Sequence, residues 1–448
     1  MFLGLLTLGS LTPLSTKAMV AEEEQGAGNT PSTTLRDPIY SYRTGFCSTD
    51  GTGDLVHGER VLRLLEAMPG SKKRFSRVSY SQDANPDREY ETSLSLAPDT
   101  TPDLAIIVSY FSGKLNAGDL FLQEYGGSGN LPMRNSRTLP LGLTFNLGYI
   151  KPAYPILLEQ SKEDLFEQLN PQWKQSIFSN TYSPEDRFVF GYYSPSTASG
   201  VMSASKPIPA SVLKSFCESP FAAGRKVTVF VKCSPSQGEV LQEELQGTNA
   251  VIAFAQQHVP DQDWHILSQL ADVSLATGDS SCSDPFFFRS LSLWNSHKDM
   301  EREMWLLTAK AWNAPEEISK ERIEEYIEAL NPHSGVLEHF MGTIDQKFID
   351  DWKVFCAHIE EKYTLTPQKL ACVLDIATQL TFLENLDKNS SEFSNSLSYL
   401  HHSIEYAREF LDPVTIGRLL NSYPSGTNID KPAEHSQRMR DLLNIMQR

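Results

Sequence analysis

From residue 38 onward, the apolar positions of the chain form short β-type runs that alternate with helical patterns. Val61, Leu64, Leu65 and Met68 repeat at the i, i+3, i+4, i+7 spacing of a helix, and Pro69-Gly70 ends that predicted helix. The apolar runs of this half that predict strands are residues 39–47, 77–81, 104–111, 120–125 and 141–150.

A second series of the same kind begins near residue 185. Its predicted strands are residues 188–193, 227–231, 251–254 and 273–276, and its predicted helices are residues 211–216 and 264–270. Ser234, Pro235 and Gln237 supply an N-cap serine, a proline at the first helical position and a glutamine at the third, so a helix is predicted to start there.

The last third of the chain is predicted to be helical. From Leu291 onward we find no strand-like run, whereas residues 323–330 and much of 346–412 have helical spacing. This region is predicted to form either a helical cap on the second sheet or a third domain.

Strands interleaved with helices predict the α/β class, with two Rossmann-like domains that face a cleft and a mostly helical C-terminal region. The predicted domains are an N-terminal Rossmann-like domain at 38–184, a second at 185–300 and a helical region at 301–448.

The first 37 residues are excluded from the fold. Residues 2–14 are apolar, and Ala18-Met19-Val20-Ala21 resembles a small-residue cleavage site, but no positive charge precedes the apolar run. Residues 22–37 are polar and read as a flexible lead-in. The pattern leaves a secretory signal open, so cytoplasmic and secreted locations both remain.

Composition and charge narrow the function classes. Lys and Arg total 39 and Asp and Glu total 56, so the net charge is −17. An acidic chain repels phosphate backbones and anionic lipid surfaces, which argues against a nucleic-acid partner. No window reaches 18 uninterrupted apolar residues, so no membrane span is expected. The six cysteines include no CxxC pair, which argues against a zinc ribbon.

One candidate site is the turn Asp50-Gly51-Thr52-Gly53-Asp54, which follows the first predicted strand. Its glycines permit close backbone approach, and its two carboxylates lie at the positive end of the next helix. An ionised carboxylate at a cleft can act as a general base. Asp50 and Asp54 are therefore candidate catalytic residues, and the alternative is that they only cap the turn. His57 follows, as a packed or solvated histidine or a proton-transfer group.

The second candidate is the turn Gly278-Asp279-Ser280-Ser281, between a strand and a predicted helix. Backbone N–H groups at a helix start, together with serine hydroxyls, suit a diphosphate, and glycine removes the Cβ that would obstruct it. A plain N-cap is the alternative. Tyr192 and Tyr193 end a strand on the same side of the predicted sheet, as core residues or as a stacking surface for a base.

Together the two turns resemble the GT-B glycosyltransferases, most nearly the protein-arginine rhamnosyltransferases that modify elongation factor P. That family has an Asp-x-x-Gly-Asp turn before a helix with spaced arginines; here Asp54 is followed by Arg60 and Arg63. The family's Val-Pro-Gln segment and Gly-Glu-Asp-Ser turn correspond to residues 258–262 and 278–281. The resemblance covers about half the chain.

The resemblance implies a nucleotide-diphosphate sugar as donor and a protein side chain as an acceptor. If the helix start neutralises the diphosphate, transfer needs no metal or other cofactor. For the two turns the resemblance implies catalytic roles for Asp50, Asp54 and Asp279, and donor binding by Gly278, Ser280 and Ser281. Tyr193, at the end of its strand, is the donor-binding candidate that would stack on the base. This chain departs from the family at Asp279, where the family has glutamate, at Thr277, where it has arginine, and at Asp284-Pro285.

Two alternatives remain open. The departures, with the signal-like N-terminus, fit a catalytically inactive GT-B-like binding or secreted interaction protein. Asp261-Gln262-Asp263 matches the DxD signature of metal-dependent GT-A glycosyltransferases, although its position after a proline also fits a helix cap.

Overall fold

The fold is described from a computed structural model of the chain. The described residues are 38–46, 53–68, 70–82, 101–109, 119–123, 136–140, 148–152, 160–192, 208–255, 259–276, 279–294, 299–330, 335–387 and 389–421.

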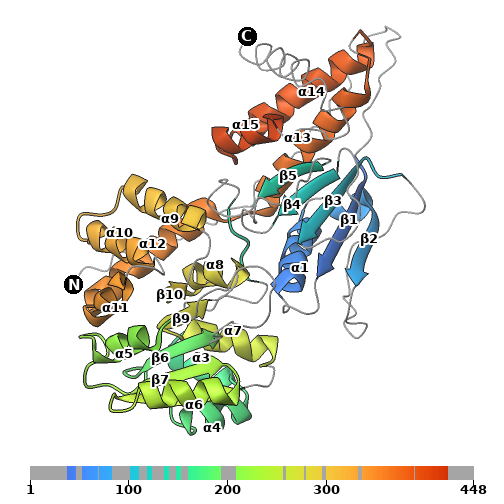
Figure 1. Cartoon of the computed structure of the whole chain (residues 1–448). Coiled ribbons are helices and arrows are strands. Elements are labelled where there is room, and N and C mark those ends of the chain that lie inside the picture. The colour runs from blue at the N-terminus through green and yellow to red at the C-terminus, as the bar shows by residue number, and fades with distance from the viewer. Residues whose placement is uncertain are drawn as a thin grey trace, which may run out of the picture. The chain divides into compact units, whose positions relative to one another are not determined.

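Two parallel sheets organise the described residues (Figure 1). The first has the strand order β2-β1-β3-β4-β5, and all its pairings are parallel. Its strands are β1 (Tyr40–Phe46), β2 (Phe75–Gln82), β3 (Leu104–Ser109), β4 (Asp119–Gln123) and β5 (Ser136–Pro140). This order is that of the flavodoxin-like doubly wound sheets, which reverse direction between the first and third strands.

The second sheet has the order β10-β9-β6-β7-β8, again with parallel pairings. Its strands are β6 (Arg187–Tyr192), β7 (Val227–Lys232), β8 (Ala250–Ala255), β9 (Val273–Ala276) and β10 (Leu291–Trp294). Counted from β6, this is the 3-2-1-4-5 order of a Rossmann fold, with its reversal between β6 and β9. The predicted α/β class with two Rossmann-like sheets is confirmed.

Helices connect and cover these sheets. Between strands lie α1 (Gly53–Glu66), α2 (Ser71–Arg74), α3 (Lys162–Gln168), α4 (Pro171–Phe178), α5 (Ala210–Glu218), α6 (Pro235–Glu244), α7 (Asp261–Leu270) and α8 (Asp279–Phe288). After them come α9 (Asp299–Ala311), α10 (Lys320–Ala329), α11 (Val336–Gly342), α12 (Gln346–Tyr363), α13 (Pro367–Asn385), α14 (Ser391–Ala407) and α15 (Pro413–Asn421). Within the described ranges, none combines the length and apolarity needed to cross a bilayer.

The second sheet is buried on both faces, as its apolar strands require. Along β6, Val189 belongs to the core that includes α5 and α9–α12, whereas Phe188 and Phe190 face a separate cluster with α3, α4 and α7. Alternate residues of a strand point to opposite faces, so one short apolar run serves two cores.

The C-terminal helices are divided between the two sheets. Trp305, Trp352 and Phe355, from α9 and α12, lie in the core of the second sheet. Residues of α13, α14 and α15 lie instead in the core of the first sheet, and Figure 1 shows α13 and α15 beside its strands. As far as residue 421, where the description ends, the C-terminal region is mostly helical as predicted, and its apolar faces complete both cores.

The chain passes between the two sheet systems at 148–152 and returns near 364, and these two segments are hydrogen-bonded. The Tyr149 N–H donates to the Tyr363 carbonyl at 2.7 Å, and the Leu365 N–H donates to the Tyr149 carbonyl at 2.7 Å. Gly148 has φ +96°, and an added Cβ there would lie 2.2 Å from the Tyr363 oxygen. The close approach of the two segments therefore requires a glycine.

The strand predicted at residues 141–150 lies mostly outside the described residues, which resume at Gly148; Tyr149 forms an isolated bridge with Thr364. β5, just before this segment, was not predicted. The prediction of no strand from Leu291 onward is wrong, because β10 begins there. Both missed strands are sheet edges, where pairing on one side alone tolerates short, polar or proline-containing sequences.

Candidate functional site

Each candidate turn follows a strand at the reversal point of its sheet. β1 borders the reversal of the first sheet, and α1, which contains Asp54, is the next described element. β9 borders the reversal of the second sheet, and α8, which begins at Asp279, is the next described element. Open α/β sheets bind ligands at the carboxyl ends of their strands at such points.

Several predicted site residues lie where their side chains are not described. Asp50, Gly278 and Tyr193 fall outside the described residues. Asp54 lies in the first turn of α1, and Asp279, Ser280 and Ser281 lie in the first turn of α8. Their roles in a site stay a prediction.

A buried ion pair joins these two helices. The Arg60 guanidinium of α1 donates to both carboxylate oxygens of Asp284 in α8, at 2.7 and 2.9 Å. The side chains are only 3% and 17% exposed. Because the contact is bidentate and largely desolvated, it fixes α1 beside α8. Asp284, a departure from the resembled family, therefore has a role in holding the helices that begin at the two candidate turns.

α1 also packs closely against its own sheet. The Tyr42 hydroxyl of β1 donates to the Gly58 carbonyl at 2.6 Å. A Cβ added at Gly58 would lie 2.3 Å from the Thr44 Oγ1 atom, so only glycine allows the helix this close to β1. His57 is 2% exposed, which confirms it as a packed rather than a solvated histidine.

His265 of α7 lies close to the same ion pair. Its pKa is lowered to about 4, chiefly by burial; the Asp284 carboxylate raises the pKa and the Arg60 charge lowers it. Its ring makes an edge contact with Phe288 of α8 at 6.0 Å. His265 is thus neutral near pH 7 and adds no third charge to the pair.

An aromatic and cationic group stands at the carboxyl ends of β6 and β7. The ring of Tyr192 lies 4.6 Å from that of Trp264, and the Lys232 ammonium lies 5.4 Å from the Tyr192 ring centroid. Burial, with a smaller contribution from Asp261, raises the pKa of Tyr192, so its phenol stays protonated. Such a surface can stack on a planar base and offer a cation to a phosphate.

Sequence analysis missed Trp264 and Lys232 as members of this group. The sequence offered one signal for Lys232: a charged residue directly follows the buried run Val-Thr-Val-Phe-Val, at the end of the predicted strand. Trp264 carried no comparable signal, because a tryptophan in a helical pattern usually belongs to a core.

Asp263 of the DxD motif has a structural role, and Asp261 lies beside it on the same helix. They lie in the first turn of α7, whose N-cap is Pro260, and no side-chain cap bond forms there. The Asp263 carboxylate instead accepts the Asn170 N–H at 2.9 Å and is 7% exposed. Among the described residues, no group of three or more His, Cys, Asp or Glu side chains has metal-binding geometry.

Comparisons with known proteins give a limited similarity. No protein-family model matches the chain. No curated protein matches it either. One similar solved structure is described as the structural basis for EarP-mediated arginine glycosylation of translation elongation factor EF-P, with 12% identity and a TM-score of 0.41, over 78% of this chain and 100% of that one.

Another is the crystal structure of the glycosyl transferase family 9 from Veillonella parvula DSM 2008, with 10% identity and a TM-score of 0.27, over 65% of this chain and 97% of that one. Both similar proteins are glycosyltransferases. At these sequence identities and TM-scores, the similarity does not assign a donor, an acceptor or a residue role to this chain.

Proposed function

We propose that the chain is a glycosyltransferase that moves a sugar from a nucleotide-diphosphate donor to an acceptor, without a metal. The observation that carries this proposal is the bidentate Arg60–Asp284 pair. It holds together the two helices that begin just after the reversal-point turns of the two sheets.

The donor would bind at the second sheet. The α8 helix start, with Gly278, Ser280 and Ser281, would hold the diphosphate, so that leaving-group charge meets pre-oriented N–H donors. This arrangement neutralises the phosphates without a metal. Tyr192 and Trp264 would stack on the base, Tyr193 would extend that surface, and Asp279 would hydrogen-bond the nucleotide or position a basic group.

The acceptor would bind at the first sheet. Asp50 or Asp54, at the positive end of α1, would take the proton of the acceptor or stabilise the positive charge that develops as it attacks. A protein side chain is the proposed acceptor, on the resemblance of the two turns to the protein-arginine rhamnosyltransferases. Arg60 is not assigned to phosphate, because both of its terminal nitrogens bond Asp284.

A catalytically inactive interaction protein with the same scaffold is the second candidate. Asp279 and the signal-like N-terminus still favour it. Asp284 does not favour an inactive protein, because its carboxylate pairs with Arg60 and so holds α1.

Nucleotide binding separates the two candidates. We expect one member of a panel of nucleoside diphosphates to raise the melting temperature, because a ligand that binds only the folded state stabilises it. Trp264→Ala should weaken that binding about tenfold through lost stacking. Tyr406→Ala is the matched control, an exposed aromatic on α14 that should leave affinity unchanged. No stabilisation by any nucleoside diphosphate would overturn the enzyme proposal and favour the interaction protein.

A further inference from the structure

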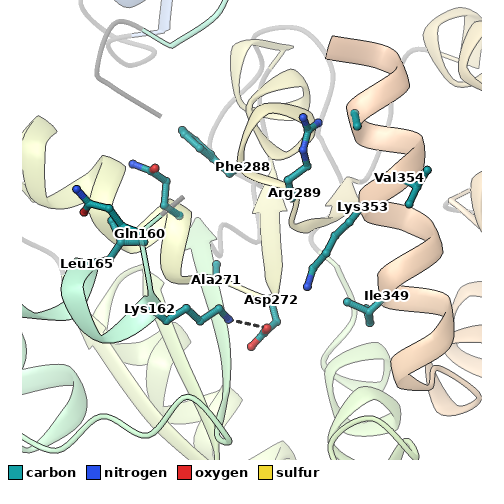
Figure 2. A pocket seen from close by; sticks show the side chains of 12 residues that line it. Gln160, Lys162, Leu165, Ala271, Asp272, Phe288, Arg289, Ile349, Lys353 and Val354 are labelled. Atoms are coloured by element: carbon teal, nitrogen blue, oxygen red, sulfur yellow. Dashed lines mark hydrogen bonds and ion pairs between the residues drawn. The ribbon is translucent and has the colours of Figure 1, made fainter. Parts of the chain in front are cut away.

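A cavity lies at the amino ends of the strands of the second sheet. Its volume is about 460 Å³, and its walls come from α3, α7, α12 and the residues that join α8 to β10 (Figure 2). Asp272 lies directly before β9, and Arg289 lies shortly before β10. The cavity is therefore at the amino ends of these strands. Tyr192 and the proposed donor site stand at the carboxyl ends, and the two sites are therefore separate.

The walls of this cavity are largely apolar. Leu165 and Ile349 are buried, Phe288 closes one side, and Val354 leaves 39% of its surface exposed. A volume of this size is within the range of small-molecule sites, which combine apolar walls with a few polar groups.

Two of the charged residues that line the cavity neutralise each other. The Lys162 ammonium pairs with the Asp272 carboxylate at 2.7 Å, drawn as a dashed line in Figure 2. Asp272 also accepts the Phe188 N–H at 2.9 Å, so its carboxylate is engaged by the sheet as well.

The other charged residues of the described lining are Arg289 and Lys353. The Arg289 guanidinium is engaged by the Glu360 carboxylate and by the Phe286 carbonyl, the latter at 3.0 Å. Among the described residues, the ion pair of Lys353 is a long one, 3.8 Å from Asp350, and the Lys353 side chain is 46% exposed. Figure 2 shows it reaching from α12 towards Lys162 and Asp272. The lining thus carries one weakly compensated positive charge.

We propose that this cavity binds a small monoanion with an apolar body, with the Lys353 ammonium as its counter-charge. The apolar walls favour a ligand with an apolar body. The weakly compensated Lys353 ammonium favours a ligand with one negative charge. A diphosphate would bring more negative charge than Lys353 balances, so the site differs in ligand class from the proposed donor site.

The test uses two fluorinated probes of the same shape, 4-(trifluoromethyl)benzoate and the neutral 4-(trifluoromethyl)benzamide, with the full chain at physiological salt. Fluorine NMR of the probe gives each dissociation constant. We expect the benzoate to bind at least about tenfold more tightly than the benzamide, because the benzoate alone brings a negative charge that can pair with the Lys353 ammonium.

Three variants locate the binding. Lys353→Glu and the milder Lys353→Gln should each weaken benzoate binding about tenfold or more, with little effect on benzamide. Ala357→Trp, which fills the cavity, should abolish binding of both probes. Lys310→Glu is the matched control, because Lys310 makes a similar ion pair, 3.6 Å from Glu328, but does not line the cavity.

Four results would overturn the proposal. The first three concern the two probes and the Lys353 variants. They are equal affinity for the two probes, no benzoate binding up to about 5 mM, the range of weak millimolar ligands, and unchanged benzoate binding in the Lys353 variants. Loss of binding in Lys310→Glu as well would also overturn it, because the attraction would then belong to general surface charge.

Discussion

Arg60 and Asp284 are the residues on which the site depends most. Their pair is buried on the arginine side and bidentate, so removal of one partner leaves a desolvated charge. We expect Arg60→Met to lower the free energy of unfolding by about 3 kcal/mol. Chemical denaturation followed by tryptophan fluorescence measures this change.

A double variant and a control make that prediction specific. Arg60→Met with Asp284→Leu should cost less than the sum of the single changes, because the two residues interact. Arg322→Met breaks a pair with Asp345 whose side chains are 29% and 43% exposed, and should cost less than about 1 kcal/mol. Additive costs, or an equal cost for Arg322→Met, would contradict the assigned role of the buried pair.

His265 makes stability depend on pH. Its pKa is lowered from 6.5 to about 4 in the folded chain, so the unfolded chain binds more protons between these values. Stability contributed by the neutral imidazole is therefore present above pH 6.5 and is lost as the pH falls towards 4, by up to about 1.4 kcal/mol per pH unit.

The His265→Gln variant isolates this contribution. The difference in unfolding free energy between wild type and variant should shrink as the pH falls from 7 to 4. A difference that is constant over that range would show that burial does not hold His265 neutral.

At the scale of elements, the packing of α1 on β1 depends on Gly58. Gly58→Ala should lower stability by about 1–3 kcal/mol, because the new methyl group would overlap Thr44. Gly417→Ala is the matched control in α15, where an added Cβ meets no atom within 4 Å, and should raise stability by up to about 1 kcal/mol. Denaturation midpoints compare the two; equal effects would contradict the close approach of α1.

Elements with strong local signals could be predicted from the sequence. Ser234 and Gln237 form the expected capping box at the start of α6, with Pro235 at its first position. Strand β9 has the predicted bounds of residues 273–276. In these segments, local hydrogen bonding and a continuous buried run specify the same structure, so tertiary context adds little.

Elements whose structure depends on a neighbour could not be predicted. β5 is Ser-Arg-Thr-Leu-Pro, too polar to register as a strand, and it pairs only with β4. Likewise, Trp264 is a site candidate because its ring lies beside Tyr192, whose ring also contacts Lys232, and these residues are far apart in the sequence. Hydrophobic periodicity shows which residues are apolar along one segment. Strand β5 and the Trp264 group depend instead on contacts between segments.

At the scale of the whole molecule, the sequence left the destination of the C-terminal helices open between a cap and a third domain. The pattern identifies an apolar helix face but does not identify its partner. In the structure, α9–α12 share the core of the second sheet and α13–α15 that of the first. The chain therefore completes its first sheet with residues more than 300 positions away from β1, as the contact of α13 with β3 and the shared core show.

The central claim is that a carboxylate at the start of α1 acts on an acceptor while the start of α8 holds the donor. Its most direct test is the transfer of labelled sugar, from the donor that the nucleotide panel selects to protein acceptors, by wild type, Asp54→Asn and Asp50→Asn. We expect at least one variant to bind the nucleoside diphosphate as wild type does and to lose transfer by about 10³-fold, the size of a general-base contribution. Transfer at the wild-type rate by both variants would contradict the account.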